Sequence, residues 1–185
     1  MADSTDLEIG RTYLDEVRRQ FRGYKRNAEE AMAQCSDEDL FRTLDAESNS
    51  IAILVQHITG NQRSRFTDFL ISDGEKPDRN RDSEFESLIQ TRDQLIQRWE
   101  KGWSILFDTI ASLQPEDLTK NVTIRGETYS ALRAINRQIA HYASHIGQII
   151  FLAKHYRSAE WKTLSIPRGK SQGPEALAAE KKRAW

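Results

Sequence analysis

The chain has 185 residues, a formal net charge of −1 and 38% hydrophobic residues. This length is typical of one domain that buries its core without disulfide bonds, and the lone Cys35 excludes an intramolecular disulfide and a thiolate-rich zinc site. The balanced charges argue against nucleic-acid and membrane partners, and neither a signal peptide nor a transmembrane helix is evident, so we expect a soluble cytoplasmic protein.

Apolar residues at helical spacing predict the first three long helices. The first runs over residues 5–32, where apolar side chains recur at steps of three and four. The second is expected over residues 48–71. The third is expected to begin at Ser83, because Glu86 three residues later would complete a capping box. Residues 72–83 between them are rich in Gly, Pro, Asp and Asn, and they read as a loop with nothing to bury.

The second half of the chain supplies a crossover, a fourth helix and a tail. Residues 118–130 look extended, with a turn candidate at 125–127, and they predict a short hairpin or an irregular crossover. The fourth helix is expected to begin at residue 129 or 130 and to last to about residue 156. Four long helices in one small domain predict an all-α four-helix bundle over residues 1–157. Residues 158–185 form a short tail that packs on the bundle or extends from it.

The fourth helix carries two histidines, His141 and His145, four positions apart. On a helical wheel they lie together, about a quarter-turn from the centre of the apolar stripe, and Gln138 and Gln148 share their face. Side chains at i and i+4 lie one above the other, so two such imidazoles can share one cation. The apolar stripe that predicts the core consists of Leu132, Ile135, Ile139, Tyr142, Ile146, Ile149 and Ala153.

A third ligand must come from another helix, and His57 is the best candidate. It lies off the apolar stripe of the second helix, on a polar flank with Asn61. Three neutral imidazoles around one divalent ion leave coordination positions open, which is typical of a catalytic site. The spacer between His141 and His145 lacks the glutamate base of metalloproteases. From spacing alone, semi-buried histidines that hydrogen-bond across the bundle remain an alternative.

Other residues fit the same hypothesis. Asn61, Gln138 and Gln148 are candidates to hydrogen-bond the second nitrogen of a ligand histidine or a metal-bound water. Gly147, inside the fourth helix, predicts either a close approach of two helices or clearance beside the metal. His155 near the end of that helix is interpreted as a cation that favours the helix C-terminus rather than as a ligand.

Three stretches resemble the DinB-like superfamily. HYASHIGQIIFLAKH, at residues 141–155, resembles its last helix, which ends with His-x-x-x-His followed closely by Gly-Gln. VQHITGN, at residues 55–61, is similar to its second helix, which carries a lone histidine. WKTLSIPRGKS, at residues 161–171, resembles the tail of a subgroup of uncharacterised bacterial DinB-like proteins. The resemblance covers residues 5–171.

The resemblance implies an antiparallel four-helix bundle with non-sequential helix order and a long crossover, often a homodimer. It also implies a divalent metal, nickel or zinc, on His57, His141 and His145. Relatives with assigned roles include S-transferases and isomerases that use bacterial low-molecular-weight thiols. We therefore expect a metal-dependent enzyme that acts on a small-molecule substrate as a thiol S-transferase or a hydrolase. The alternative is a non-catalytic metal- or ligand-binding dimeric module.

Overall fold

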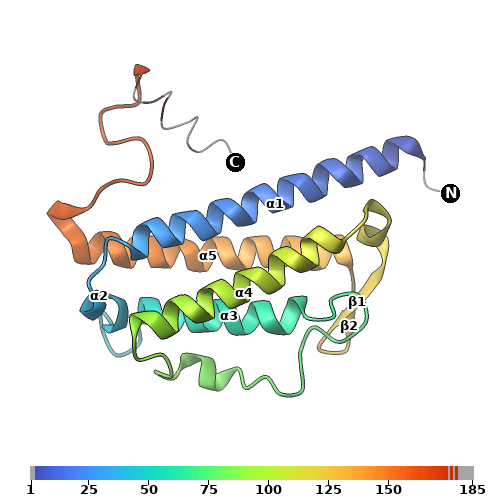
Figure 1. The fold of residues 1–185 in the computed structure, drawn as a ribbon, viewed down its shortest axis with the longest axis horizontal. Helices are drawn as coiled ribbons and strands as arrows, with labels where there is room; N and C mark the ends of the chain where they lie inside the picture. Colours follow the sequence, from blue (N-terminus) through green and yellow to red (C-terminus); the bar gives the residue numbers. More distant parts are fainter. Residues whose placement is uncertain (1–2, 175, 177, 179–185) are drawn as a thin grey trace.

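The computed structural model describes residues 3–174, 176 and 178, and it is mostly helical with one small two-stranded sheet (Figure 1). None of the helices in this described part has the length and apolarity that crossing a bilayer requires. The four long helices are α1 (Ser4–Met32), α3 (Ile51–Phe66), α4 (Arg92–Ser112) and α5 (Ala131–Arg157).

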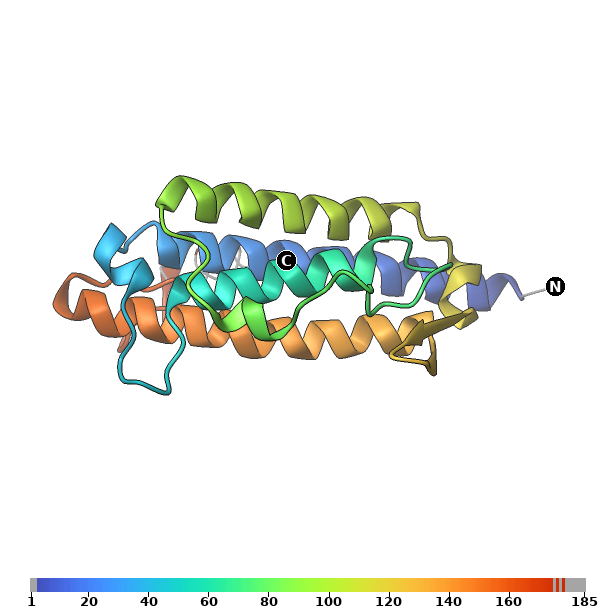
Figure 2. The same cartoon turned by 90° about the horizontal axis from the view of Figure 1, so that it is seen from below.

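The long helices lie side by side in an order that differs from their order in the chain (Figures 1 and 2). Helix α1 packs mainly against α5, and α3 packs mainly against α4; weaker contacts join α3 to α5 and α1 to α4. Figure 1 shows α1 and α5 running in one direction and α3 and α4 in the other. Because α3 and α4 are parallel neighbours, the chain must return along their whole length between them, and residues 67–91 make that return.

The connections contain short elements. These are α2 (Asp37–Phe41), three 3₁₀ turns η1 (Asp82–Phe85), η2 (Pro115–Thr119) and η3 (Ser158–Glu160), and the strands β1 (Asn121–Ile124) and β2 (Glu127–Ser130). The antiparallel strands are joined by Arg125 and Gly126, which both have positive φ, as a two-residue type I′ hairpin turn requires. The Asp73 carboxylate accepts both backbone N–H groups of this turn, each at 2.9 Å, so the loop after α3 holds the hairpin in place.

Aromatic side chains from different helices fill the core. Phe21 on α1 lies 6.3 Å from Trp103 on α4 and 5.9 Å from Tyr142 on α5, measured between ring centroids. All three side chains are fully buried, as is Trp99. Such inclined aromatic pairs add about 0.5–1.5 kcal/mol each to the energy of burial alone. The Tyr142 hydroxyl is satisfied because it donates to Asn61 Oδ1 on α3 at 2.8 Å.

The second and third helices are shorter than predicted. Helix α3 ends at Phe66 because Asp68 has a φ of 51°, and Ile71, the predicted last residue of the helix, is 85% exposed. The third helix does not begin at Ser83, which lies in η1. Helix α4 begins only after Thr91, whose side chain accepts the backbone N–H of Gln94. The prediction followed apolar spacing through residues 85–89, which instead pack as an irregular segment on α3.

The fourth helix lies close to its predicted bounds, and the chain just beyond it contacts the region that follows α1. Helix α5 begins after Ser130, whose side chain caps it, and its apolar stripe is buried except for Leu132, which is 37% exposed in the first turn, and Ile139, which is half-buried. Beyond η3, the backbone of Lys162 exchanges hydrogen bonds with the Gln34 side chain at the end of α1. Residues 175–185, the last part of the predicted tail, lie almost wholly outside the described residues.

Candidate metal centre

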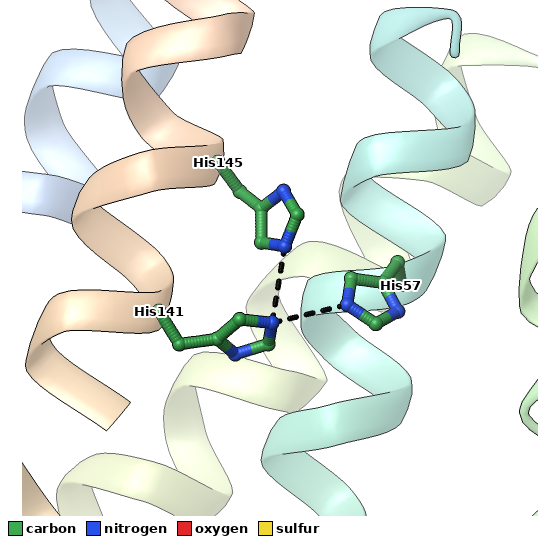
Figure 3. A group of neighbouring side chains, drawn as sticks. All are labelled: His57, His141 and His145. Atoms are coloured by element: carbon green, nitrogen blue, oxygen red, sulfur yellow. Dashed lines mark hydrogen bonds between the residues drawn. The ribbon is translucent and has the colours of Figure 1, made fainter. Parts of the chain in front are cut away.

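Helices α3 and α5 bring three histidines together, His57 from α3 and His141 and His145 from α5 (Figure 3). Nε2 of His141 lies 3.1 Å from Nε2 of His57 and 3.0 Å from Nε2 of His145. The three ligand atoms all lie within 4.8 Å of one another. The rings that the sequence singled out from two distant parts of the chain therefore converge on one point.

His57 is oriented by two residues of η1. Its Nδ1 donates a hydrogen bond to Oε2 of Glu84 at 2.9 Å, and its ring stacks on Phe85 with centroids 4.9 Å apart. Figure 2 shows η1 lying beside α3. Because an ionised carboxylate only accepts hydrogen bonds, Nδ1 of His57 carries a ring hydrogen, and the tautomer with its single hydrogen there has a lone pair on Nε2.

A residue of its own helix orients His145 so that its Nε2, like that of His57, faces His141. Its Nδ1 donates to Oε1 of Gln148 at 3.0 Å, one turn further along α5. Burial lowers the pKa of His145, although the hydrogen bond to Gln148 opposes this effect. The neutral ring therefore presents its Nε2 lone pair toward His141, as His57 does from the other side.

His141 receives both lone pairs at one nitrogen. Burial is the main cause that lowers the pKa of His141, to about 3, and the nearby Arg79 and Arg65 act in the same direction, so its ring is neutral near pH 7. A neutral ring has at most one hydrogen on Nε2, which cannot serve two acceptors in good geometry. A cation would accept all three lone pairs. Two nitrogens bound tetrahedrally to a zinc ion lie about 3.3 Å apart, close to both measured Nε2 separations, so this donor set could hold a divalent metal.

Glu84 is itself fixed from two sides. Arg79 donates to both of its oxygens, from Nε to Oε1 at 2.7 Å and from Nη2 to Oε2 at 2.9 Å. Burial alone would raise the pKa of Glu84, but the hydrogen bonds from His57 and Arg79 and the charge of Arg79 lower it overall. The Glu84 carboxylate also needs Gly60 on α3, because a Cβ at that position would lie 2.5 Å from Oε1.

A cavity of about 280 Å³ adjoins the histidines. It is lined by His57, Asn61, Arg65, Arg79, Arg81, Arg125, Arg137, Gln138 and His141. Of the three polar side chains expected at histidine nitrogens, only Gln148 lies at one. Asn61 instead accepts from Tyr142, and Gln138 is 4% exposed with an Oε1 that has no partner among the described residues.

The sequence interpretation missed Glu84, Arg79 and Phe85. It treated residues 72–83 as having nothing to bury, yet the side chain of Arg79 is only 6% exposed, and it gave no role to Glu84, which fell in the predicted third helix and whose side chain is only 8% exposed. Their burial is possible because the two charges pair with each other and with His57. No local pattern indicates this contact, which depends on residues 67–91 folding back along α3. The only local signal was Gly60, a helical glycine three positions after His57.

Comparison with known proteins gives one family match. A family described as "Protein of unknown function (DUF1572)" matches residues 8–170, a range that includes the three histidines, Glu84 and the hairpin. Neither the curated proteins nor the solved structures yield a significant match. Because the matched range covers most of the sequence, the chain belongs to the DUF1572 family.

Proposed function

We propose that this chain is a DinB-like four-helix-bundle enzyme that binds nickel or zinc through His57, His141 and His145 and acts on a small molecule. One observation carries the proposal: three Nε2 atoms converge while Glu84 and Gln148 hold the Nδ1 atoms of two rings. Protein groups that bind the outer nitrogen of a ligand histidine are typical of metal sites. Three histidines leave room for a substrate on the ion, unlike a closed structural zinc site.

Transfer of a thiol fits the surrounding residues better than hydrolysis. Such an ion supplies Lewis-acid chemistry that activates a thiol or water. Hydrolysis would be assisted by a free general base, but no carboxylate lines the described cavity, and Glu84 is held by His57 and Arg79. Cys35 is buried and burial raises its pKa to about 11, so it is a poor nucleophile. The thiol would therefore come from a low-molecular-weight substrate.

The metal is tested first, on protein purified without a histidine tag. We expect about one nickel or zinc per chain by elemental analysis, and we expect His141→Ala and His145→Ala to lose it while keeping their helical circular dichroism. His155→Ala is the matched control, because His155 is an exposed histidine near the end of the same helix. Retention of metal by either cluster variant, or a collapse of helicity, would contradict the proposed ligand set.

Activity is tested on metal-loaded protein with monochlorobimane and a panel of bacterial low-molecular-weight thiols. We expect conjugation that disappears in His145→Ala. The absence of a free general base also suits the second candidate, a non-catalytic metal- or ligand-binding dimer. Bound metal without turnover of any thiol would favour that module. Light scattering tests the homodimer that both candidates expect.

A further inference from the structure

We propose that the cavity beside the three histidines is a binding site for the carboxylate or phosphate group of a small ligand. The inference deepens the proposed function, on which it rests for the assumption that this ligand is the substrate. Five arginines and no carboxylate line the cavity among the described residues, and His57 and His141 form part of the same wall. An anion held by the arginines would therefore place the rest of its molecule beside the histidines.

Two arginines form a buried floor. The side chains of Arg65 and Arg79 are each only 6% exposed. Arg65 donates to the carbonyl oxygen of Gly74 and to Oε2 of Glu75 at 3.0 Å, while Arg79 is held by Glu84 and lies 3.4 Å from Glu75. These contacts fix both guanidinium groups before any ligand arrives, so little conformational entropy is lost on binding.

Three exposed arginines form the rim, each from a different segment. Arg81 precedes η1, Arg125 lies in the hairpin turn, and Arg137 is on α5. Arg125 pairs with Glu75 at 2.9 Å. Arg81 and Arg137 form no ion pair within the described part of the chain, although Arg137 donates to the Tyr129 hydroxyl at 3.1 Å. Arg81 and Arg137 therefore keep guanidinium N–H groups that can donate hydrogen bonds to a ligand.

The charges around the cavity do not balance. Glu75 and Glu84 pair with three of the five lining arginines, so these two carboxylates set against five guanidinium groups leave an excess of three positive charges. The whole chain has a formal net charge of −1, so this excess is local. A concave site of one charge sign attracts the opposite charge, and the guanidinium fork matches the geometry of carboxylate and phosphate.

Gln138 adds a second requirement for the ligand. Its Oε1 is buried in the wall and has no hydrogen-bond donor among the described residues. A buried acceptor without a partner costs about 1–3 kcal/mol, so a ligand that supplies a donor there gains affinity. The matching ligand therefore carries a hydroxyl or amine close to its anionic group.

The test is an NMR titration of the protein with inorganic phosphate, lactate, propionate and the neutral propionamide. We expect saturable binding of phosphate or lactate, stronger binding of lactate than of propionate because only lactate offers a hydroxyl to Gln138, and no binding of propionamide. The double variant Arg81→Gln/Arg137→Gln should weaken anion binding at least about tenfold with unchanged metal content. Arg133→Gln is the control, an exposed arginine on α5 outside the cavity lining.

Failure of this inference is distinguishable from failure of the proposed function. The titration is repeated on His145→Ala, which removes a metal ligand that does not line the cavity. Anion binding that persists there identifies the arginines, and not the metal, as the binding group. If neither phosphate nor lactate saturates the protein, or if the double variant binds as wild type does, the anion site is wrong even where metal is bound. Anion binding by protein that never binds metal would overturn only the proposed function.

Discussion

At the scale of single residues, the hydrogen bond at Nδ1 of a histidine determines whether its Nε2 can bind a metal. Glu84 holds His57 through Nδ1, and Arg79 holds Glu84. We expect Glu84→Gln to lower metal affinity by about 10- to 100-fold, because the neutral amide polarises His57 less and leaves Arg79 without its charge partner. Competition with a chromophoric chelator measures this affinity.

Glu86 provides the control for that substitution. It lies two residues beyond Glu84 and its side chain is exposed, so Glu86→Gln should bind metal as wild type does. An unchanged affinity in Glu84→Gln would mean that His57 does not need its carboxylate partner, and it would weaken the assignment of His57 as a ligand.

Cys35 gives a prediction about pH. Burial, and to a smaller extent the nearby Asp39 carboxylate, raise the pKa of its thiol to about 11 against the opposing charges of arginines. With that pKa, only about one thiol in a thousand is ionised at pH 8. Alkylation by iodoacetamide should therefore be very slow in the folded protein, and its rate should rise with pH until about pH 11. Protein unfolded in guanidinium should react rapidly, and equal rates in both states at pH 8 would contradict the raised pKa.

The residues of the site differ in how far the sequence could predict them. His141 and His145 are one helical turn apart, and the flank position of His57 made it a candidate ligand, so local periodicity indicated all three as candidates while leaving hydrogen-bonded histidines as an alternative. The contact of Gln148 with His145 could be predicted for the same reason, because Gln148 follows His145 by three residues on one helix. Glu84 lies 27 residues from His57, and its contact depends on a chain reversal that no periodic pattern describes.

At the scale of the helices, replacing two glycines with alanine should change the free energy of unfolding in opposite directions. A Cβ on Gly60 in α3 would lie 2.5 Å from Glu84 Oε1, whereas a Cβ on Gly147 in α5 meets nothing within 4 Å. A close helix approach therefore does not explain Gly147. We expect Gly147→Ala to raise the free energy of unfolding by roughly 0.5–1 kcal/mol, because alanine restricts the unfolded chain and favours helix.

Gly60→Ala should have the reverse effect. The added methyl would displace the Glu84 carboxylate from His57, so both the free energy of unfolding and the metal content should fall despite the higher helix propensity of alanine. Urea unfolding followed by circular dichroism measures the first quantity and elemental analysis the second. If both alanine variants were stabilised alike, the packing of Glu84 against α3 would be wrong.

The helix boundaries show where periodicity misleads. Phe85 and Ile89 fit a helical stripe, yet Phe85 stacks on His57 and Ile89 is buried outside any helix. An apolar spacing reports which side chains become buried, and here tertiary contacts bury them in an irregular segment. Ser130 and Thr91 both cap helices, but only Ser130 stood at a clear change from extended to helical pattern.

At the scale of the whole molecule, helix number was easier to predict than helix order. An apolar stripe identifies the face of a helix that is buried, but it does not identify the helix that covers it. The pattern of α3 says even less about which helices pack against it. This helix is buried on almost every side, including the polar flank with His57 and Asn61. Long connections allow α1 to pair with α5 and α3 to pair with α4. The paths of these connections depend on tertiary contacts such as that of Asp73 with the hairpin turn.

The proposed metal would join those two pairs, and this predicts a change in global stability. His57 belongs to α3, His141 and His145 belong to α5, and these helices pack less extensively with each other than with their main partners. A ligand that binds only the folded state at 100 times its dissociation constant adds about 2.7 kcal/mol. For a chain of this size, that corresponds to a rise in Tm of roughly 5–10 °C. We expect nickel or zinc to produce such a rise in a thermal melt, EDTA to reverse it, His57→Ala to abolish it and His155→Ala to retain it. An equal rise in His57→Ala would show that the ion binds elsewhere and does not connect α3 to α5.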